Sequence, residues 1–283
     1  MKQVSSIKEV RAEIAELKVQ GKRIAFVPTM GALHEGHVSL IRLAKKKADK
    51  VVVSIYVNPE QFGPNEDFEE YPRQMGDDLK ACKAEGVALV FTPNDEIMYG
   101  SGTKYFSIEI EHLNEHMDGG SRPGFFEGIV LVVNKLFNII KPDVAVFGQK
   151  DIQQFQILKQ MVREFNHDIE LVAAPIARAN DGLALSSRNA YLSDQERVIA
   201  PGLYRALQYV KKQIRDGVLE PKLLLQHQQD ELEAKGFKND YLNVFSMDTM
   251  EPVNRLEAGS TYILAGAVYL GKTRLIDNII LDL

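Results

Sequence analysis

The fold class follows from one stretch, Ile24-Ala25-Phe26-Val27-Pro28-Thr29-Met30-Gly31-Ala32-Leu33-His34-Glu35-Gly36-His37-Val38-Ser39-Leu40. Its apolar beginning, residues 24–27, is typical of a buried parallel strand, and residues 38–48 carry apolar side chains at helical spacing. The turn between them contains glycines, which let the backbone approach a ligand closely. A helix start also offers unpaired amides and a partial positive charge that suit a phosphate. The stretch therefore predicts a nucleotide site.

Two histidines stand at the start of this helix. His34 and His37 are three residues apart, so both can project from one side and donate hydrogen bonds to phosphate oxygens. They could instead form half of a metal site, but no cysteine or third histidine follows at ligand spacing. The spacing also differs from the four-residue spacing of zinc proteases. We therefore favour a nucleotide over a metal and predict no metal ligands.

Composition narrows the class of protein. The chain has 283 residues, enough for one large domain or two smaller ones. With 34 basic and 39 acidic residues its net charge is −5, which is not a nucleic-acid footprint. The single Cys82 excludes an internal disulfide and fits a reducing compartment; we expect a buried thiol on a helix rather than a nucleophile. Without a signal-peptide core or a membrane-length apolar run, we expect a cytoplasmic protein that binds no membrane.

Strand-like and helix-like segments alternate along the first 175 residues. Such alternation predicts βαβ units around a Rossmann-like parallel sheet, an α/β nucleotide-binding domain over residues 1–175. Residues 125–140 are apolar on nearly every side and predict a central, deeply covered helix. Ligands of such sheets bind beyond the carboxyl ends of the strands. The predicted strands are 24–27, 51–57, 87–91, 144–147 and 169–173, and the predicted helices are 7–20, 38–48, 75–85, 125–140 and 152–165.

The pattern changes after Pro175. A polar loop is followed by helical stretches near 194–215 and 221–235, and then by segments that alternate in strand fashion. Gly271-Lys272 suits a hairpin turn between the last two of these segments. We therefore predict a smaller C-terminal α+β domain over residues 176–283. Its predicted strands are 241–245, 261–270 and 273–281.

Three further segments carry side chains suited to a nucleotide and a small acid. In Gly148-Gln149-Lys150-Asp151, which follows a predicted strand, Lys150 can reach a phosphate and Asp151 can accept from ribose or orient the lysine, although Asp151 could equally be a helix cap. Ser186-Ser187-Arg188 offers hydroxyls and a guanidinium fork that match the geometry of phosphate oxygens. Taken alone, however, this segment indicates an ordinary turn with a surface arginine. Gln61 and Gln154 are neutral amides that can bind a hydroxyl and a carboxylate together.

Together these segments resemble the pantothenate synthetases, the pantoate–β-alanine ligases. The matching segments, in the family's order, are residues 28–37, 58–62, 148–154 and 185–189. The family shares its His-x-Gly-His element with class I aminoacyl-tRNA synthetases. The resemblance implies ligation of pantoate and β-alanine in two steps: pantoate and ATP give pantoyl adenylate and pyrophosphate, and β-alanine then gives pantothenate and AMP. It also implies Mg²⁺ with the ATP and a homodimer.

The resemblance assigns roles to individual residues. His34 and His37 would hydrogen-bond the phosphates, with His37 as general acid, while Lys150 and Arg188 would join Ser186 and Ser187 in clamping the phosphate oxygens. Gln61 and Gln154 would hold pantoate, with Gln61 also near the incoming amine. The C-terminal domain would close over the ATP, and Ala177 would touch the adenine through its backbone. The rest of the nucleotide site would comprise Met30, Gly31, Ala32, Leu33, Glu35, Gly36, Gly148, Gln149, Asp151 and Leu185.

The chain departs from the family pattern at two positions. Phe125 stands where many relatives carry a histidine, and Leu185 stands where a methionine is frequent.

Other classes of protein remain open. A nucleotidylyltransferase shares the histidine element but would need a cationic acceptor pocket. An aminoacyl-tRNA synthetase would need a basic RNA-binding extension. A non-catalytic nucleotide-binding module would not need Lys150 beside Asp151, and pyrophosphate release would distinguish these classes.

Overall fold

The computed structural model describes residues 1–64, 66–100 and 105–283. The described part of the chain divides into two compact units. Residue 175, the predicted domain boundary, is also where the last segment of unit 1 ends. Two short segments before that boundary nevertheless belong to unit 2. Unit 1 consists of Met1–Ile110, Pro123–Gln149 and Gln154–Pro175, and unit 2 consists of Glu111–Arg122, Lys150–Gln153 and Ile176–Leu283.

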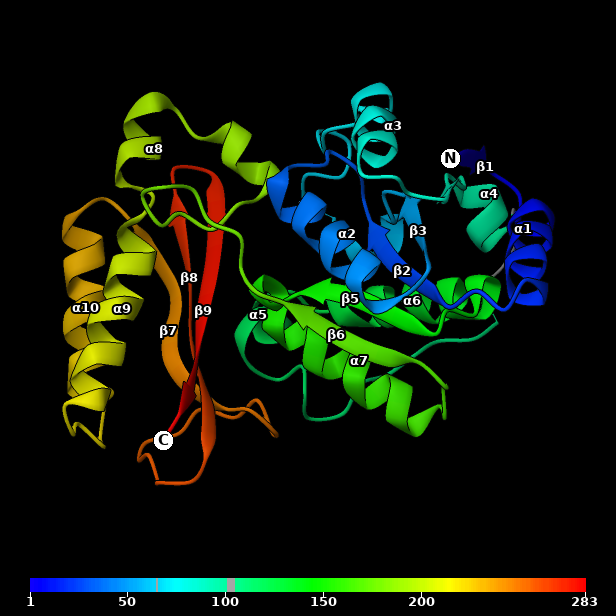
Figure 1. The fold of residues 1–283 in the computed structure, drawn as a ribbon. Helices are drawn as coiled ribbons and strands as arrows, with labels where there is room; N and C mark the ends of the chain where they lie inside the picture. Colours follow the sequence, from blue (N-terminus) through cyan, green and yellow to red (C-terminus); the bar gives the residue numbers. More distant parts are fainter. Residues whose placement is uncertain (65, 101–104) are drawn as a thin grey trace. The chain divides into compact units, whose positions relative to one another are not determined.

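Unit 1 is built on a parallel sheet. In its described residues six strands lie in the order β1-β4-β3-β2-β5-β6, and each neighbouring pair is parallel (Figure 1). This arrangement confirms the predicted Rossmann-like sheet and brings the carboxyl ends of β2 and β5 to the same edge. The strands are β1 (Lys2–Val4), β2 (Ile24–Thr29), β3 (Lys50–Ile55), β4 (Leu89–Phe91), β5 (Val144–Gly148) and β6 (Glu170–Ala174).

Helices cover both faces of this sheet. On one face α2 (Glu35–Lys47) packs Ile41 into a buried cluster with strand side chains such as Val27. On the other face lies α6 (Phe125–Ile140), whose Phe137 ring meets Phe26 edge-on at 6.4 Å. The central strands carry mostly apolar side chains because neither face meets water. Helix α6 is mostly buried, as predicted from its apolar composition.

The remaining elements of unit 1 are mostly short. Cys82 on α3 is fully buried, and burial raises the pKa of its thiol to about 11, so it is an inert core residue as predicted. The edge strand β1 and the helix α4 were not predicted, because three to five residues are too few to show a period. These elements are α1 (Ile7–Val19), η1 (Pro59–Gln61), α3 (Met75–Ala84), α4 (Asp95–Tyr99), η2 (Gln149–Asp151) and α7 (Ile152–Glu164). The elements η2 and α7 each contain residues of both units.

Unit 2 contains an antiparallel sheet. Its described residues form three strands, β7 (Lys238–Ser246), β8 (Thr261–Leu270) and β9 (Thr273–Asp282), in the order β7-β8-β9. Gly271 and Lys272 make the turn between β8 and β9, and Gly271 has φ +57°. A tight hairpin requires such a positive φ, which glycine adopts without strain. The predicted hairpin and α+β class are therefore confirmed.

Two different groups of side chains cover the faces of this sheet. Helices α9 (Gly202–Arg215) and α10 (Lys222–Ala234) pack Leu207 and Leu225 onto one face. On the other face Met117 of α5 (Met117–Ser121) packs in a cluster with Ile263 of β8. The segment 111–122 thus completes the core of unit 2 although it precedes α6 in the chain.

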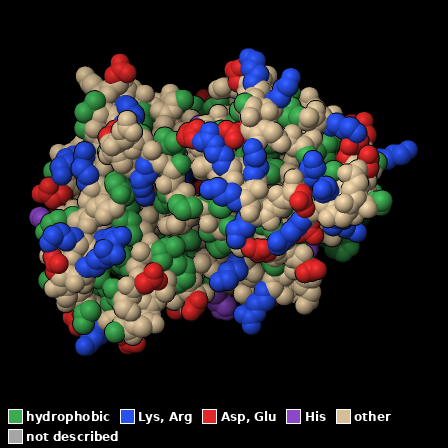
Figure 2. Space-filling view, viewed as in Figure 1, with side chains coloured by type: hydrophobic (Ala, Val, Ile, Leu, Met, Phe, Trp, Pro, Cys, Tyr) green, Lys and Arg blue, Asp and Glu red, His purple; other side chains and the backbone are tan. Residues whose placement is uncertain are grey.

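The predicted helical stretch 194–215 is broken in two. α8 (Asp194–Ile199) and α9 are separated at Ala200-Pro201, with Pro201 as the cap before α9. Proline has no backbone amide to continue the first helix, which explains the break. None of the described helices is long and apolar enough to cross a membrane. On the face shown in Figure 2, basic and acidic side chains are interspersed.

Candidate functional site

The loop after β2 turns sharply into α2. Thr29 Oγ1 donates to the carbonyl of Ser54 at 2.8 Å and accepts from the amide of Gly31 at 3.2 Å. Gly31 (φ +83°) and Ala32 (φ +50°) both lie in the left-handed region. A left-handed alanine is strained, so outside contacts must hold the turn.

Asp78 supplies those contacts. Its carboxylate accepts from the amides of Ala32 at 3.0 Å and Leu33 at 2.7 Å, and the residue is only 2 % exposed. Burial raises the pKa of Asp78 above its ordinary value, and the two amide hydrogen bonds act in the opposite sense. A Cβ on Gly31 would lie 2.8 Å from Asp78 Oδ2, so the carboxylate also requires glycine there. Sequence reasoning missed Asp78, because an Asp in a helix's first turn is common.

His34 and His37 form a reciprocal cap at the start of α2. His34 Nδ1 accepts from the amide of Gly36 at 3.1 Å, and His37 Nδ1 accepts from the amide of His34 at 3.3 Å. The ring centroids are 4.2 Å apart. A backbone amide can only donate, so each Nδ1 must be an acceptor and each neutral ring carries its hydrogen on Nε2. Both imidazoles therefore have an Nε2–H donor, which is the group a phosphate oxygen requires.

The amides of this loop differ from the sequence expectation. We expected unpaired amides at the helix start, yet those of residues 31, 32, 33, 34 and 36 all donate to side chains. Helix α2 also begins at Glu35 rather than at residue 38, because His34 acts as its N-cap. Glu35 forms an ion pair with Arg42 on the outer side of the helix. The donors that this loop can offer a phosphate are therefore mainly its imidazoles.

Gln61 meets this loop within unit 1. It ends η1, and its Nε2 lies 3.0 Å from Met30 Sδ, with the amide hydrogen bond directed at the sulfur. Gly148 and Gln149 come at the end of β5, the strand beside β2. Gln154 lies half-buried on α7, in unit 1 as well. The unit thus places Gln61 against the histidine loop, and the end of β5 at the same sheet edge.

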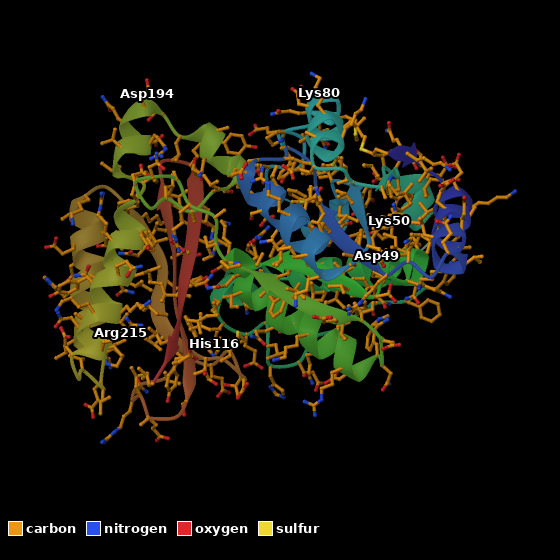
Figure 3. The ribbon with its side chains drawn as sticks, viewed as in Figure 1. Asp49, Lys50, Lys80, His116, Asp194 and Arg215 are labelled. Atoms are coloured by element: carbon orange, nitrogen blue, oxygen red, sulfur yellow. The ribbon has the colours of Figure 1, made fainter. Side chains whose placement is uncertain are left out.

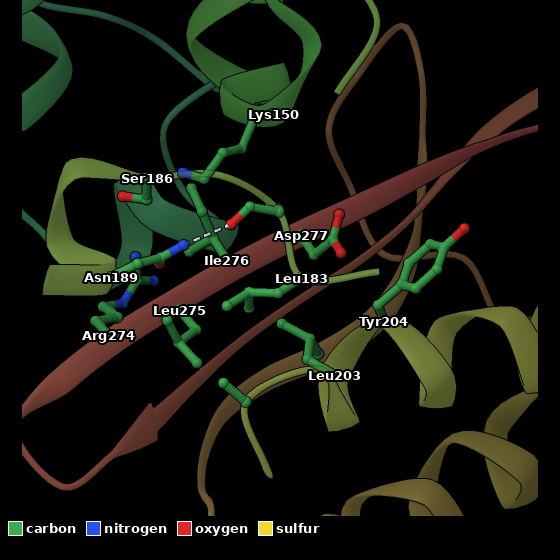
Figure 4. Close-up of a pocket in the computed structure, with 12 residues that line it drawn as sticks. Lys150, Leu183, Ser186, Asn189, Leu203, Tyr204, Arg274, Leu275, Ile276 and Asp277 are labelled. Carbon is green, nitrogen blue, oxygen red and sulfur yellow. Dashed lines mark hydrogen bonds between the residues drawn. The ribbon is translucent and has the colours of Figure 1, made fainter. Parts of the chain in front are cut away.

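Lys150 and Ser186 line one pocket of unit 2 (Figure 4). Lys150 Nζ is 3.8 Å from Asp151 Oδ1, and the Lys150 carbonyl accepts from Asn278 Nδ2 at 2.9 Å. Asn189 lines the same pocket; it belongs to the matching segment 185–189, but no role was predicted for it. A lysine ammonium and a hydroxyl in one pocket suit an anionic oxygen.

The segment 185–189 is shaped by its own hydrogen bonds. Ser186 Oγ accepts from the amide of Arg188 at 3.3 Å and so caps η3 (Ser187–Tyr191). Asn189 Nδ2 donates to the carbonyl of Ala184 at 3.0 Å, the dashed line in Figure 4. The amide of Leu185 donates to the carbonyl of Ala177 at 2.9 Å. Ser187 and Arg188 lie on the first turn of η3 and are not among the side chains that line the pocket with Lys150.

A small hairpin carries this segment, and Arg178 anchors it. Residues 177–185 form the hairpin, with Arg178 bridged to Ala184. The guanidinium of Arg178 makes two contacts with the buried carboxylate of Asp277, at 2.5 and 2.8 Å. It also lies 3.8 Å from the centre of the Tyr204 ring. A forked, stacked arginine of this kind positions the hairpin firmly on β9 and α9.

The two departures from the family pattern are both apolar residues. Phe125 is the first residue of α6, and its ring centroid lies 4.9 Å from that of Phe126. Leu185 is half-buried beside Ser186.

Similarity to known proteins, in sequence and in structure, extends over nearly the whole chain. The family model for pantoate-beta-alanine ligase matches residues 2–280. The pantothenate synthetase of Pseudomonas fluorescens is 45 % identical over 284 aligned residues, covering 100 % of this chain and 99 % of the relative. A pantothenate synthetase structure from Thermus thermophilus superposes with a TM-score of 0.91 at 40 % identity, covering 99 % of each chain.

A third comparison is with a ligand complex. The pantoate-beta-alanine ligase of Francisella tularensis, solved with beta-gamma ATP and beta-alanine, has a TM-score of 0.83 at 34 % identity, covering 99 % of this chain and 97 % of that one. Full-length similarity of this kind, in both sequence and fold, goes beyond a shared architecture. The chain therefore belongs to the pantoate–β-alanine ligase family.

Proposed function

We propose that this protein joins pantoate to β-alanine with the consumption of ATP, through a pantoyl-adenylate intermediate, and releases AMP and pyrophosphate. The observation that carries the proposal is the pair of imidazoles at the start of α2. Their Nδ1 atoms accept from backbone amides, which leaves Nε2 as the donor nitrogen of each ring. Family membership and the ATP and beta-alanine named for the Francisella tularensis relative support the same reaction.

The first step forms the adenylate. A pantoate carboxylate oxygen attacks the α-phosphorus of ATP, the bond from that phosphorus to the bridging oxygen breaks, and pyrophosphate leaves with the electron pair. Negative charge grows on the phosphate oxygens, and preorganised donors lower the barrier by stabilising it. We assign this role to His34, His37 and Lys150, with Ser186, Ser187 and Arg188 as further donors. The resemblance gives His37 the role of general acid; with Nδ1 accepting from the His34 amide its ring is neutral, and we assign to it hydrogen-bond donation toward the leaving group.

The second step forms the amide. The amine of β-alanine attacks the acyl carbon, the bond from that carbon to the phosphate oxygen breaks, AMP leaves, and the amine loses a proton. Gln61 and Gln154 are proposed to hold the pantoyl group, because their amides bind hydroxyl and carbonyl oxygens without adding charge. Fixed geometry between amine and acyl carbon supplies much of the rate.

Further features are proposed on the family resemblance. Mg²⁺ accompanies ATP; proteins bind this ion largely through phosphate oxygens, water and one or two carboxylates, and it neutralises triphosphate charge. Asp78, the carboxylate that contacts the histidine loop, is already bonded to two amides, which fits an ion held mainly by the nucleotide. Residues 176–283 are proposed to close over ATP, and the protein to act as a cytoplasmic homodimer.

The test is pyrophosphate release from ATP and Mg²⁺, with pantoate alone and then with β-alanine. We expect pantoate-dependent release that rises to steady turnover when β-alanine is added, with AMP and pantothenate formed. Release without either acid, or only with a phosphate acceptor, would indicate a nucleotidylyltransferase, and ATP binding without release would indicate a binding module. Lys150→Ala should lower the rate by on the order of 10²–10³-fold, whereas Lys159→Ala, an exposed lysine of α7, should not.

A further inference from the structure

A chain of three polar side chains runs from α4 to the histidine loop within unit 1. The Tyr99 hydroxyl donates to Asn58 Oδ1 at 2.6 Å. Asn58 Nδ2 in turn lies 3.2 Å from Gln61 Oε1 and 3.2 Å from the carbonyl of Gly128. Gln61 Nε2 lies against Met30 Sδ. Asn58 is only 1 % exposed, so its orientation is set by these partners rather than by water.

The orientation of the Asn58 and Gln61 side-chain amides follows from neighbouring groups that can only donate or only accept a hydrogen bond. The carbonyl of Gly128 can only accept, so Asn58 Nδ2 must face it. The amide of Glu60 can only donate, and it lies 3.3 Å from Asn58 Oδ1, on the side where Tyr99 donates. Asn58 Nδ2 then donates to Gln61 Oε1, which leaves Gln61 Nε2 as the donor end. Because a thioether is a weak acceptor, this nitrogen keeps donor capacity for a ligand.

We propose that Tyr99 is a positioning residue of the acid-binding site: its hydroxyl holds the Asn58 side chain in place, and Asn58 holds Gln61 with Nε2 as the donor end toward the oxygens of the acid. This inference rests on the proposed function of Gln61 as a pantoate ligand. Pantoate presents hydroxyl and carboxylate oxygens, which accept hydrogen bonds, so the donor end of Gln61 is the end required. The Tyr99 hydroxyl makes the shortest of these contacts to Asn58, at 2.6 Å, so without it the Asn58 side chain is held only by the hydrogen bonds of 3.2 to 3.3 Å.

Tyr56 provides a matched control. Its ring centroid lies 6.4 Å from that of Tyr99, and its hydroxyl donates to Asp95 Oδ1 at 2.8 Å, outside the chain of contacts described above. Burial raises the pKa of both phenols, so both remain protonated donors at neutral pH. Tyr99→Phe and Tyr56→Phe therefore each remove one buried hydroxyl and keep the ring. The Tyr99 variant also keeps the ring face against Lys135.

The experiment is steady-state kinetics with pantoate, ATP and β-alanine varied in turn, with melting temperatures measured for every variant. We expect Tyr99→Phe to raise the KM for pantoate roughly 3- to 10-fold, with the KM for ATP unchanged. Tyr56→Phe should change neither the KM for pantoate nor the KM for ATP. In a Gln61→Ala background, Tyr99→Phe should have less than about a twofold further effect, because the group that it positions is gone.

Several outcomes would overturn the inference. These are an unchanged pantoate KM in Tyr99→Phe, an equal change in Tyr56→Phe, or the same effect with and without Gln61. If Tyr99→Phe does not fold, Asn58→Ser tests the same contacts, since serine still caps η1 but lacks Nδ2; its effect must also vanish in the Gln61→Ala background. A wild-type protein that forms no pantothenate would contradict the proposed function itself, a result distinct from any of these.

Discussion

The carboxylate of Asp78 on α3 accepts a 2.7 Å hydrogen bond from the backbone amide of Leu33, across 45 residues of sequence. Through this bond and the parallel one from Ala32, the third helix holds the turn that presents the two histidines. The turn contains a left-handed alanine, so the carboxylate stabilises a conformation that the local sequence would not adopt alone.

Replacing Asp78 should therefore loosen the histidine loop. Asp78→Asn exchanges one acceptor oxygen for an amide group, which leaves a buried backbone N–H without a partner. We expect a loss of about 1–3 kcal/mol in unfolding free energy and a raised KM for ATP, measured by urea denaturation and initial-rate kinetics.

The neighbouring Asp77 is the control for this change. It pairs with Lys80 at 2.8 Å on the outer side of α3, where Figure 3 labels Lys80, and both side chains are exposed. Asp77→Asn should leave the melting temperature and the KM for ATP unchanged. Equal effects of the two variants would show that Asp78 does not act through the loop amides.

Gly128 allows η1 to approach α6. A Cβ at Gly128 would lie 2.0 Å from the Glu60 carbonyl oxygen, and neither backbone can yield without moving the other. Gly128→Ala should cost about 1–3 kcal/mol of stability and raise the KM for pantoate, because Gln61 moves with η1. Gly76→Ala, in a helix with nothing within 4 Å, should instead stabilise by up to about 1 kcal/mol. A stable Gly128→Ala enzyme with an unaltered pantoate KM would contradict this account.

Arg178 should matter for stability and nucleotide use together. Arg178→Met leaves the Asp277 carboxylate buried without its cation, which costs about 3–5 kcal/mol, and frees the 177–185 hairpin that leads into Ser186. We expect a lower melting temperature and a higher KM for ATP. Lys212→Met, which removes an exposed helix pair with Asp216, should alter neither. If Arg178→Met loses stability but keeps the wild-type KM for ATP, then anchoring of the hairpin by Arg178 does not control nucleotide binding.

His167 should make stability sensitive to acid. Burial lowers its pKa below the ordinary 6.5, and its Nε2 lies 2.9 Å from Asn134 Oδ1. The unfolded chain therefore takes up this proton at a higher pH than the folded chain. The stabilising contribution is present above the unfolded pKa and is lost as the pH falls through the folded value.

Urea midpoints at about pH 8 and about pH 5 test this prediction. His167→Gln should lose less stability between the two conditions than the wild-type protein does. His227→Gln, an exposed histidine of α10, should behave as the wild type. Identical pH dependence in all three proteins would rule out the contribution of His167.

Much of the fold was predictable because its signals are local. The apolar run 24–27 with the following glycines predicted β2 and its turn, and the Gly271-Lys272 pair predicted the last hairpin. Hydrophobic period and turn chemistry are properties of neighbouring residues, so they can be read along the chain. The errors were also local in origin: three-residue strands carry no period, and the break at Pro201 was overlooked.

The sequence by itself determined the fold class, the order of the strands and helices along the chain, and which short segments bear donors suited to phosphate. Only the tertiary structure decided how those donors are held. Asp78 bonds Leu33 across 45 residues, Asn58 bonds Gly128 across 70, and Arg178 bonds Asp277 across 99. Such partners are brought together by sheet topology and packing, and a pattern over a few neighbouring residues contains no information about side chains so distant in the chain.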